Sequence, residues 1–294
     1  MARLVKNTTL ENVAQFLEMI APKSLAGSWD NVGLLAQAPT PCEGNGVFLA
    51  VDLTTEVADE LLSLRSMNTA IIYHPVIFSP VRSLKLAVPL QQSVLRCIAA
   101  GVSIYCPHTC LDAMDGGIND WLVVGLAYPW EDGAPQEGEI VALLKGGSNS
   151  KPVEPCSAPR TPTEGLGRVK QLARTCTLAD MVSRTKQFLG LQHVQIALAD
   201  GKNMSSTLGS FATCAGSGAS VLRACTDVDV WITGEASHHE ILAANAQGVS
   251  LIITNHTNTE RRFFRDVFAP LLRDQLPALQ VHVSDKDRDP LMTV

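Results

Sequence analysis

The sequence repeats one short pattern in which a histidine and a threonine are followed, after two further residues, by an acid. The first copy runs from His108 to Asp112 and the second from His256 to Glu260. Each copy follows a glycine and a short apolar segment, which predicts the histidine at the carboxyl end of a strand, where open α/β sheets place their ligands. Borderline divalent ions bind this mixture of imidazole nitrogen and carboxylate oxygen. The repeated pattern therefore predicts a metal centre.

A third histidine, His74, ends the apolar segment Ala70 to Ile72, and the following proline stops the strand there. By itself, such a histidine is more often a hydrogen-bonded surface group. His256 and Glu260 share a face only if a helix begins directly after the preceding strand. The alternative is a capped helix whose acid merely favours the positive amino end. Three strand-end histidines with two acids favour the shared metal site.

Three other segments have weaker signals. The loop at Gly216 to Gly218 could hold an anion on exposed amides, although tight-turn packing is the stronger interpretation. A later segment opens a serine-capped helix with two adjacent histidines that point in different directions. There we interpret His239 as a proton carrier rather than a ligand. The turn that begins at Trp29 is interpreted as packing, with Asp30 and Asn31 fixing the loop.

Composition excludes several classes of protein. The chain has 294 residues, 46% of them hydrophobic, which suffices for one large or two ordinary domains. A net charge of -6 and a pI of about 5.6 disfavour direct nucleic-acid binding. No apolar run is long enough for a membrane span, and Met1 to Lys6 do not resemble a secretory signal.

The eight cysteines contain no C-x-x-C pair, which predicts reduced, buried thiols in a reducing compartment. The cytoplasm is expected first, with the nucleus or mitochondrion as alternatives. Cys106 and Cys110 flank His108 and could be soft metal ligands, but they lack the second pair of a structural zinc site. Buried thiols are therefore the preferred interpretation.

The elements that must position these residues alternate between strand and helix, which predicts an α/β fold with mainly parallel sheets. In the first half we expect strands at 47–52, 69–73 and 102–105, with helices at 10–20, 57–66 and 88–100. In the second half we expect strands at 194–198, 210–213, 228–232, 250–254 and 279–284, with helices at 178–189, 219–225, 237–247 and 261–275. The predicted organisation is an N-terminal lobe at 1–130, a connecting segment at 131–167 with one edge strand, and a C-terminal lobe at 168–294.

Longer motifs run through almost the whole chain: SWDNVGLL (28–35), YHPVIF (73–78), the stretch from Pro107 to Leu122, CAGSG (214–218), TGEASHH (233–239), NHTNTER (255–261) and DRDP (287–290). With these motifs the sequence resembles the Nif-three-like family, also catalogued as GTP cyclohydrolase type-two homologues. The resemblance implies two α/β lobes packed around a shared dinuclear metal site, and ring-shaped assemblies. It implies His74, Asp112, His256 and Glu260 as metal ligands, with Glu260 as the bridge. The expected cofactors are divalent ions (zinc, iron or manganese), one or two per chain.

The chain departs from the family pattern at two places. Bacterial relatives generally have two consecutive histidines where this chain has Tyr73 and His74, which removes one ligand of one metal. The tyrosine form resembles the eukaryotic branch. Many members of that branch insert a domain where 160–167 joins the lobes directly here, so an activity of that domain does not carry over.

The resemblance and the residues together favour a metal-dependent hydrolase of a nucleotide or phosphoester, with His108 or His239 shuttling a proton. GTP cyclohydrolysis itself rests on the resemblance alone, and whether the protein is an enzyme stays open. The alternative is a ring-shaped adaptor or transcriptional co-regulator that binds protein partners, with the metal structural. A third interpretation is metal storage. A homo-oligomer, hexamer or dimer, is expected, with no nucleic-acid or membrane partner.

Overall fold

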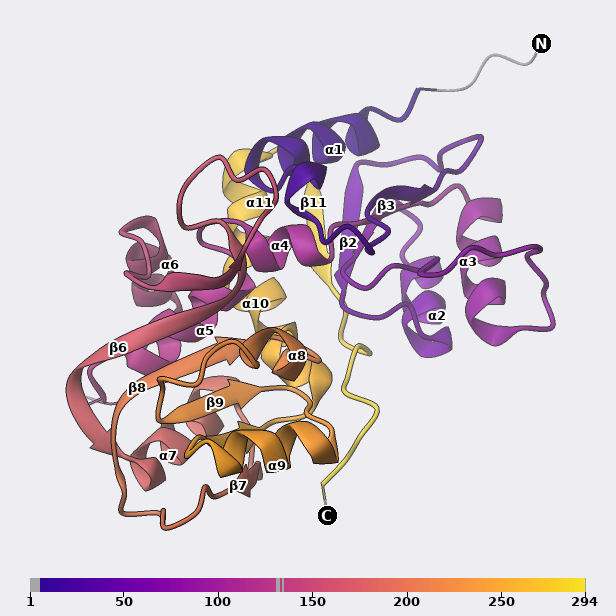
Figure 1. The fold of residues 1–294 in the computed structure, drawn as a ribbon. Coiled ribbons are helices and arrows are strands. Elements are labelled where there is room, and N and C mark those ends of the chain that lie inside the picture. The colour runs from indigo at the N-terminus through magenta and orange to yellow at the C-terminus, as the bar shows by residue number, and fades with distance from the viewer. Residues whose placement is uncertain (1–5, 131–132, 134, 294) are drawn as a thin grey trace. The chain divides into compact units, whose positions relative to one another are not determined.

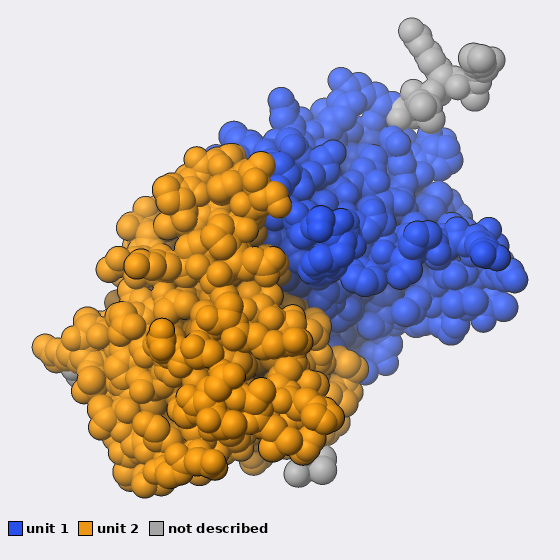
Figure 2. Space-filling view, in the orientation of Figure 1, with its two compact units in different colours: residues 1–111, 264–288 blue, residues 112–263, 289–294 orange. Residues whose placement is uncertain are grey.

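A computed structural model describes residues 6–130, 133 and 135–293, which fold into two compact units (Figure 1). Unit 1 comprises residues 1–111 and 264–288, and unit 2 comprises residues 112–263 and 289–294, as coloured in Figure 2. The basic start, apart from Lys6, lies outside the described residues, as do 131, 132 and 134 in the expected connecting segment. The boundaries at 130 and 167 stay a prediction.

Unit 1 is built on a five-stranded sheet in the order β1-β4-β3-β2-β11. Its strands are β1 (Gly33–Ala36), β2 (Gly46–Ala50), β3 (Met67–Ile72), β4 (Ser103–Cys106) and β11 (Gln280–Val283). The pairs β11–β2, β2–β3 and β3–β4 are parallel, and β1 is an antiparallel edge. The last strand of the chain thus lies beside β2, as Figure 1 shows in yellow. The carboxyl ends of β2, β3 and β4 share one edge of the sheet.

The helices of unit 1 pack around a sheet whose central strands β2, β3 and β4 are buried along their whole length. They are α1 (Thr8–Ile20), α2 (Thr55–Ser63), α3 (Pro89–Ala99), the short α4 (Thr109–Ala113), which continues into unit 2, and α11 (Ala269–Gln275). Asn7 caps α1, since its side chain accepts from the Leu10 amide. Helices α2 and α3 pack Val57, Leu61, Val94 and Cys97 onto the sheet core.

Unit 2 contains a six-stranded sheet in the order β5-β6-β8-β9-β10-β7. Its strands are β5 (Lys151–Pro155), β6 (Gly165–Thr177), β7 (Gln195–Ala197), β8 (Thr207–Cys214), β9 (Val230–Thr233) and β10 (Ser250–Ile253). The three strands β8, β9 and β10 are parallel, and antiparallel strands flank them on both sides. The expected α/β class is confirmed in both units, and both sheets are mixed.

The helices of unit 2 are α5 (Ile118–Ala127), α6 (Glu137–Lys145), α7 (Leu178–Leu189), α8 (Ala219–Leu222), α9 (His238–Ala246) and α10 (Arg261–Phe263). Helix α7 begins as predicted after Thr177, whose hydroxyl accepts from the Asp180 amide in a capping box. Helices α5 and α7 approach closely at Gly125, where a Cβ would overlap the ring of Phe188.

Several elements differ from the expectation. The apolar run 140–144 is helical, as part of α6, whereas β5 is the edge strand expected in the connecting segment. The expected helix 261–275 is interrupted by a π-helix, Phe264–Phe268, at the point where the chain passes from unit 2 to unit 1. Strands β1 and β6 and helix α5 were not expected. Within the described ranges, no helix has both the length and the apolar character that crossing a bilayer requires.

Candidate metal centre

In unit 1, His74 follows β3 and is held by a carboxylate. Its Nδ1 lies 2.9 Å from Oδ1 of Asp52, which follows β2. Asp287, from the segment after β11, accepts hydrogen bonds from the amides of Val51 (2.8 Å) and Asp52 (3.4 Å). The Asp52 carboxylate therefore lies on a backbone that Asp287 fixes, and it holds the His74 imidazole through Nδ1.

His108, after β4, is held in the same manner by Asp30. Its Nδ1 lies 2.8 Å from Oδ1 of Asp30, whose Oδ2 accepts from the amide (3.2 Å) and hydroxyl (2.5 Å) of Thr109. The Asp30 side chain is fully buried. Burial raises the pKa of this carboxyl, but the hydrogen bonds and charge of His108 and the hydrogen bonds of Thr109 outweigh burial, so its pKa lies below the ordinary value.

The two histidines of unit 1 lie together, with ring centroids 5.4 Å apart. The centroid of the Tyr73 ring lies 5.2 Å from that of His108 and 5.7 Å from that of Phe264. Tyr73 is 1% exposed. Its peptide oxygen also accepts from the His108 amide at 3.2 Å. Tyr73 therefore packs beneath the histidine pair as part of the core.

In unit 2, His256 and Glu260 face each other, with Nε2 and Oε1 3.5 Å apart. The expected helix is a 3-10 turn, His256–Thr259, preceded by Asn255 with a φ of 66°. The tighter turn still brings positions 256 and 260 onto one side. Glu260 is 1% exposed, whereas the His256 side chain is 30% exposed.

The other ring nitrogen of His256 also faces a carboxylate. Nδ1 lies 3.1 Å from Oε2 of Glu235, which accepts from the Ser217 hydroxyl at 2.6 Å. Glu235 follows β9 and Ser217 follows β8, so three neighbouring strand ends converge on this histidine.

A glycine keeps open the space beside Nε2 of His256 and Oε1 of Glu260. Gly216 has a φ of 61°, and a Cβ there would lie 2.8 Å from both Oε1 of Glu260 and Nε2 of His256. Its amide donates to the Thr259 hydroxyl at 2.8 Å, which fixes the glycine against the turn. The imidazole, the buried carboxylate and the open space fit a divalent cation.

Asp112 belongs to the same neighbourhood of unit 2 and is 8% exposed. Burial raises the pKa of the Cys214 thiol, and the negative charges of Asp112 and Glu260 raise it further. Both carboxylates thus lie close enough to the end of β8 to raise the pKa of its last residue, Cys214. The side chain of Asn119 links the two segments, because its Nδ2 donates to the Asp112 backbone carbonyl and its Oδ1 accepts from the Ala215 backbone amide, each at 3.0 Å.

The remaining candidates lie elsewhere or are unsuited to metal binding. His239 is exposed on α9, with its ring against His238 at 5.5 Å. Cys106 and Cys110 are buried, and burial raises the pKa of Cys106 to about 12, which disfavours a thiolate. Glu60, His282 and Asp285 form another possible ligand group. There, however, Glu60 accepts from the His282 ring at 3.0 Å and from the Asp285 amide at 2.9 Å, as a structural junction would.

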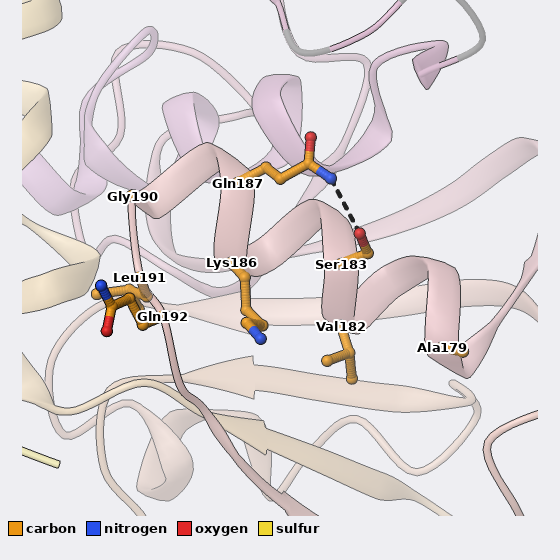
Figure 3. A pocket seen from close by; sticks show the side chains of 8 residues that line it. All are labelled: Ala179, Val182, Ser183, Lys186, Gln187, Gly190, Leu191 and Gln192. Carbon is orange, nitrogen blue, oxygen red and sulfur yellow. Dashed lines mark hydrogen bonds between the residues drawn. The ribbon is translucent and has the colours of Figure 1, made fainter. Parts of the chain in front are cut away.

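An open pocket lies along α7, lined by Ser183, Lys186, Gln187 and their neighbours (Figure 3). Its labelled side chains come from α7 and the loop that follows, away from the carboxyl ends of β8 to β10 in the sequence. It contains none of the predicted site residues.

The sequence interpretation missed the supporting acids Asp52, Glu235, Asp287 and Asp289. Asp289 Oδ2 accepts from the amide (3.1 Å) and hydroxyl (2.7 Å) of Thr257. The available signals were the DRDP motif and the position of Asp52 and Glu235 directly after strands. A strand-end acid is so common, however, that only its partner reveals a role.

Comparison with known proteins places these features in a family. Residues 8–290 match the model of Duf34/NIF3 (NGG1p interacting factor 3). A Schizosaccharomyces pombe protein called Protein NIF3 homolog is 38% identical over 95% of both chains, and NGG1-interacting factor 3 of Saccharomyces cerevisiae is 35% identical over 99% of both. Among solved structures, a Bacillus cereus protein related to NIF3 has the same fold, with a TM-score of 0.80, 19% identity and coverage of 99% of this chain and 100% of that one.

Proposed function

The chain belongs to the Duf34/NIF3 family, and we propose that it is a divalent-metal-binding hydrolase that acts on a nucleotide or another phosphoester. The proposed ligands are His74, Asp112, His256 and Glu260, with Glu260 as the bridge. One observation carries the proposal. Three strand-end histidines each have a carboxylate at Nδ1, at distances of 2.8 to 3.1 Å.

A carboxylate at Nδ1 favours the tautomer that has its proton on this nitrogen, and it leaves the lone pair on Nε2. This carboxylate–histidine pairing is the usual support for a histidine that binds a metal. It also raises the basicity of Nε2. A histidine that binds no metal does not need a carboxylate at Nδ1, so a single pair would be weak support for a metal site. Three pairs at the ends of adjacent strands in each sheet favour a common purpose.

A bound divalent cation would supply a Lewis acid that polarises a phosphoryl oxygen and makes water more acidic. The protein would do the remaining work. His108 is the preferred proton carrier, because Asp30 fixes its orientation while Nε2 stays available to accept a proton. The exposed His239 is the weaker candidate.

Metal content per chain, measured by plasma mass spectrometry, is the first test. We expect His256→Ala and Glu260→Gln to lose the metal and any hydrolysis of nucleotides or phosphoesters. His282→Ala is the matched control, since His282 is also a half-buried, carboxylate-paired histidine. If His256→Ala and Glu260→Gln keep full metal content and turnover, the site is wrong.

The number of ions depends on Tyr73. About two ions in the wild type would mean that this tyrosine permits a dinuclear centre. One ion, rising in Tyr73→His, would mean that one position has been lost with the missing imidazole. The identity of the metal, whether zinc, iron or manganese, comes from the same measurement.

A second function, binding of protein partners, is favoured by the name of the yeast relative and by an exposed apolar segment. Residues 78–90 are exposed throughout and include Leu86 (64%) and Leu90 (63%). If this function is the main one, partner binding should survive Glu260→Gln. Assembly into a homo-oligomer, a hexamer or a dimer, is part of the proposal, and light scattering after gel filtration tests it.

A further inference from the structure

Two large aromatic side chains of unit 1 lie exposed beside His108. Trp29 is 59% and Phe78 53% exposed, although their ring centroids are only 6.1 Å apart. The same rings lie 6.1 Å and 6.4 Å from the His108 ring. Ring faces of this size are normally buried, so a pair that stays exposed next to an anchored histidine suggests a binding surface.

Both rings come from loops that are held in place. The indole of Trp29 packs against Gly27, where a Cβ would come within 2.9 Å of it. The Gly27 amide donates to the Thr109 hydroxyl at 3.0 Å, and Asn31 Nδ2 donates to the Ile77 carbonyl at 2.5 Å. The turn that carries Trp29 is thus tied both to the His108 loop and to the loop that carries Phe78. A surface held in this way loses little entropy on binding.

The chemistry of this surface selects a flat aromatic ring. Aromatic side chains stack on nucleobases of any sequence, because every base has a π-face. Asp30 fixes the His108 ring through Nδ1, and this ring stands edge-on to Trp29 and Phe78, at 78° and 83°, so it bounds one side of the surface while its Nε2 is left for the proposed proton transfer. An aliphatic partner would instead favour the leucines at 84–90, where no polar group is needed.

We propose that Trp29 and Phe78, whose rings are inclined at 57° to each other, form a stacking platform for the base of a nucleotide, in which one ring stacks on the base and the other contacts its edge, with His108 beside them. This inference rests on the proposed function, since it specifies which phosphoesters the site accepts. His74, a proposed metal ligand, lies beside His108. A base on the platform would therefore leave its ribose and phosphate on the side of the metal ligand.

Tryptophan fluorescence tests the platform, because Trp121 and Trp231 are buried and Trp130 is half-buried, whereas Trp29 is exposed. Loss of the nucleotide-dependent quenching in Trp29→Ala assigns the signal to Trp29. The probes are guanosine monophosphate, adenosine monophosphate and ribose 5-phosphate, added to the full-length protein loaded with metal. We expect the two nucleotides to quench the fluorescence and to bind at least about tenfold more tightly than ribose 5-phosphate. Equal affinity for all three, or no binding of nucleotides, would overturn the platform.

Variants separate stacking from general damage. We expect Trp29→Ala and Phe78→Ala each to weaken nucleotide binding, measured by calorimetry, about tenfold, with ribose 5-phosphate and metal content unchanged. Trp29→Phe should restore much of the affinity. Leu86→Ala, at an equally exposed position, is the control and should have no effect. If Leu86→Ala weakens binding as much as Trp29→Ala, the surface is a general apolar one and the proposal fails.

The two proposals can fail separately. Hydrolysis of phosphoesters that lack a base as rapidly as nucleotides, unaffected by Trp29→Ala, would retain the hydrolase and overturn the platform. Nucleotide binding that depends on Trp29, without hydrolysis of any phosphoester, would retain the platform and overturn the hydrolase.

Discussion

The two copies of the histidine–threonine pattern are held by the same device. In the first copy, Asp30 accepts from the amide and hydroxyl of Thr109. In the second, Asp289 accepts from the amide and hydroxyl of Thr257. A residue with positive φ lies at the strand end each time, His108 at 29° and Asn255 at 66°. The threonine of the pattern and an aspartate distant in sequence therefore form a hydrogen-bonded pair that fixes the loop. We call this pair the latch.

The copies differ in whether the aspartate also binds the histidine of the pattern. Asp30 also holds the histidine of its own copy, whereas the histidine of the second copy turns one nitrogen to Glu235 and the other to Glu260. In the first copy, moreover, the chain leaves unit 1 between the histidine and the acid. The same five-residue pattern thus holds its histidine by one aspartate in the first copy and between two glutamates in the second. In the proposed function, this difference separates a proton carrier from a pair of metal ligands.

Removing the charge of each latch should have unequal effects on stability. Asp30→Asn should lower the free energy of unfolding by about 3 kcal/mol, because a fully buried carboxylate loses charge-assisted bonds to both His108 and Thr109. Asp289→Asn, at a partly exposed position, should cost about 1 kcal/mol. Urea unfolding measures both. Equal losses would mean that the latch alone, and not the histidine bond, matters at Asp30.

The second copy should be the more sensitive to added bulk. Gly216→Ala should weaken metal binding about 100-fold, because the new Cβ would lie 2.8 Å from both proposed ligand atoms, His256 Nε2 and Glu260 Oε1. Gly201→Ala is the control, since Gly201 has a similar φ of 74° and open space around it. Titration with a competing chelator measures the affinity. A similar loss in both variants would assign the effect to backbone strain.

The supporting acids should tune metal affinity in both units. Asp52→Asn and Glu235→Gln should each weaken metal binding by about 10-fold or more, since each orients a proposed ligand through its Nδ1. Glu60→Gln, which removes the charge beside His282, should leave metal affinity as it is. An effect of Glu60→Gln equal to the others would show that the loss is a general destabilisation.

The smallest effect is a pH dependence that belongs to the first copy alone. The pKa of Asp30 lies below its ordinary value of 3.8, so the folded state favours the charged carboxylate. Its stabilisation should be fully present above about pH 4 and be lost as the pH falls through the folded-state pKa. The difference in unfolding free energy between wild type and Asp30→Asn should therefore shrink in acid. A difference that stays constant down to the acid transition would contradict this.

Local signals in the sequence predicted the elements that have a clear period or cap. Helix α7 has the expected bounds, and the parallel strands of unit 1 also agree with the expectation. Helix α5 gave no such signal, because nearly all of it is buried and it lacks a polar face. Strand β6 also gave no signal, although much of it is exposed. Its exposed and charged residues do not alternate with buried ones.

The sequence by itself determined which residues could do chemistry, because strand-end position and residue type are local properties. It identified the three histidines, the acids of the pattern and the role of Asp30 in fixing its loop. Only the tertiary structure decided that Asp30 also holds His108, 78 residues away, and that Glu235 faces His256. It likewise left Trp29 exposed, although packing was the expectation. These pairings depend on which loops the strand order brings together, and no periodicity or cap in one segment encodes a partner in another.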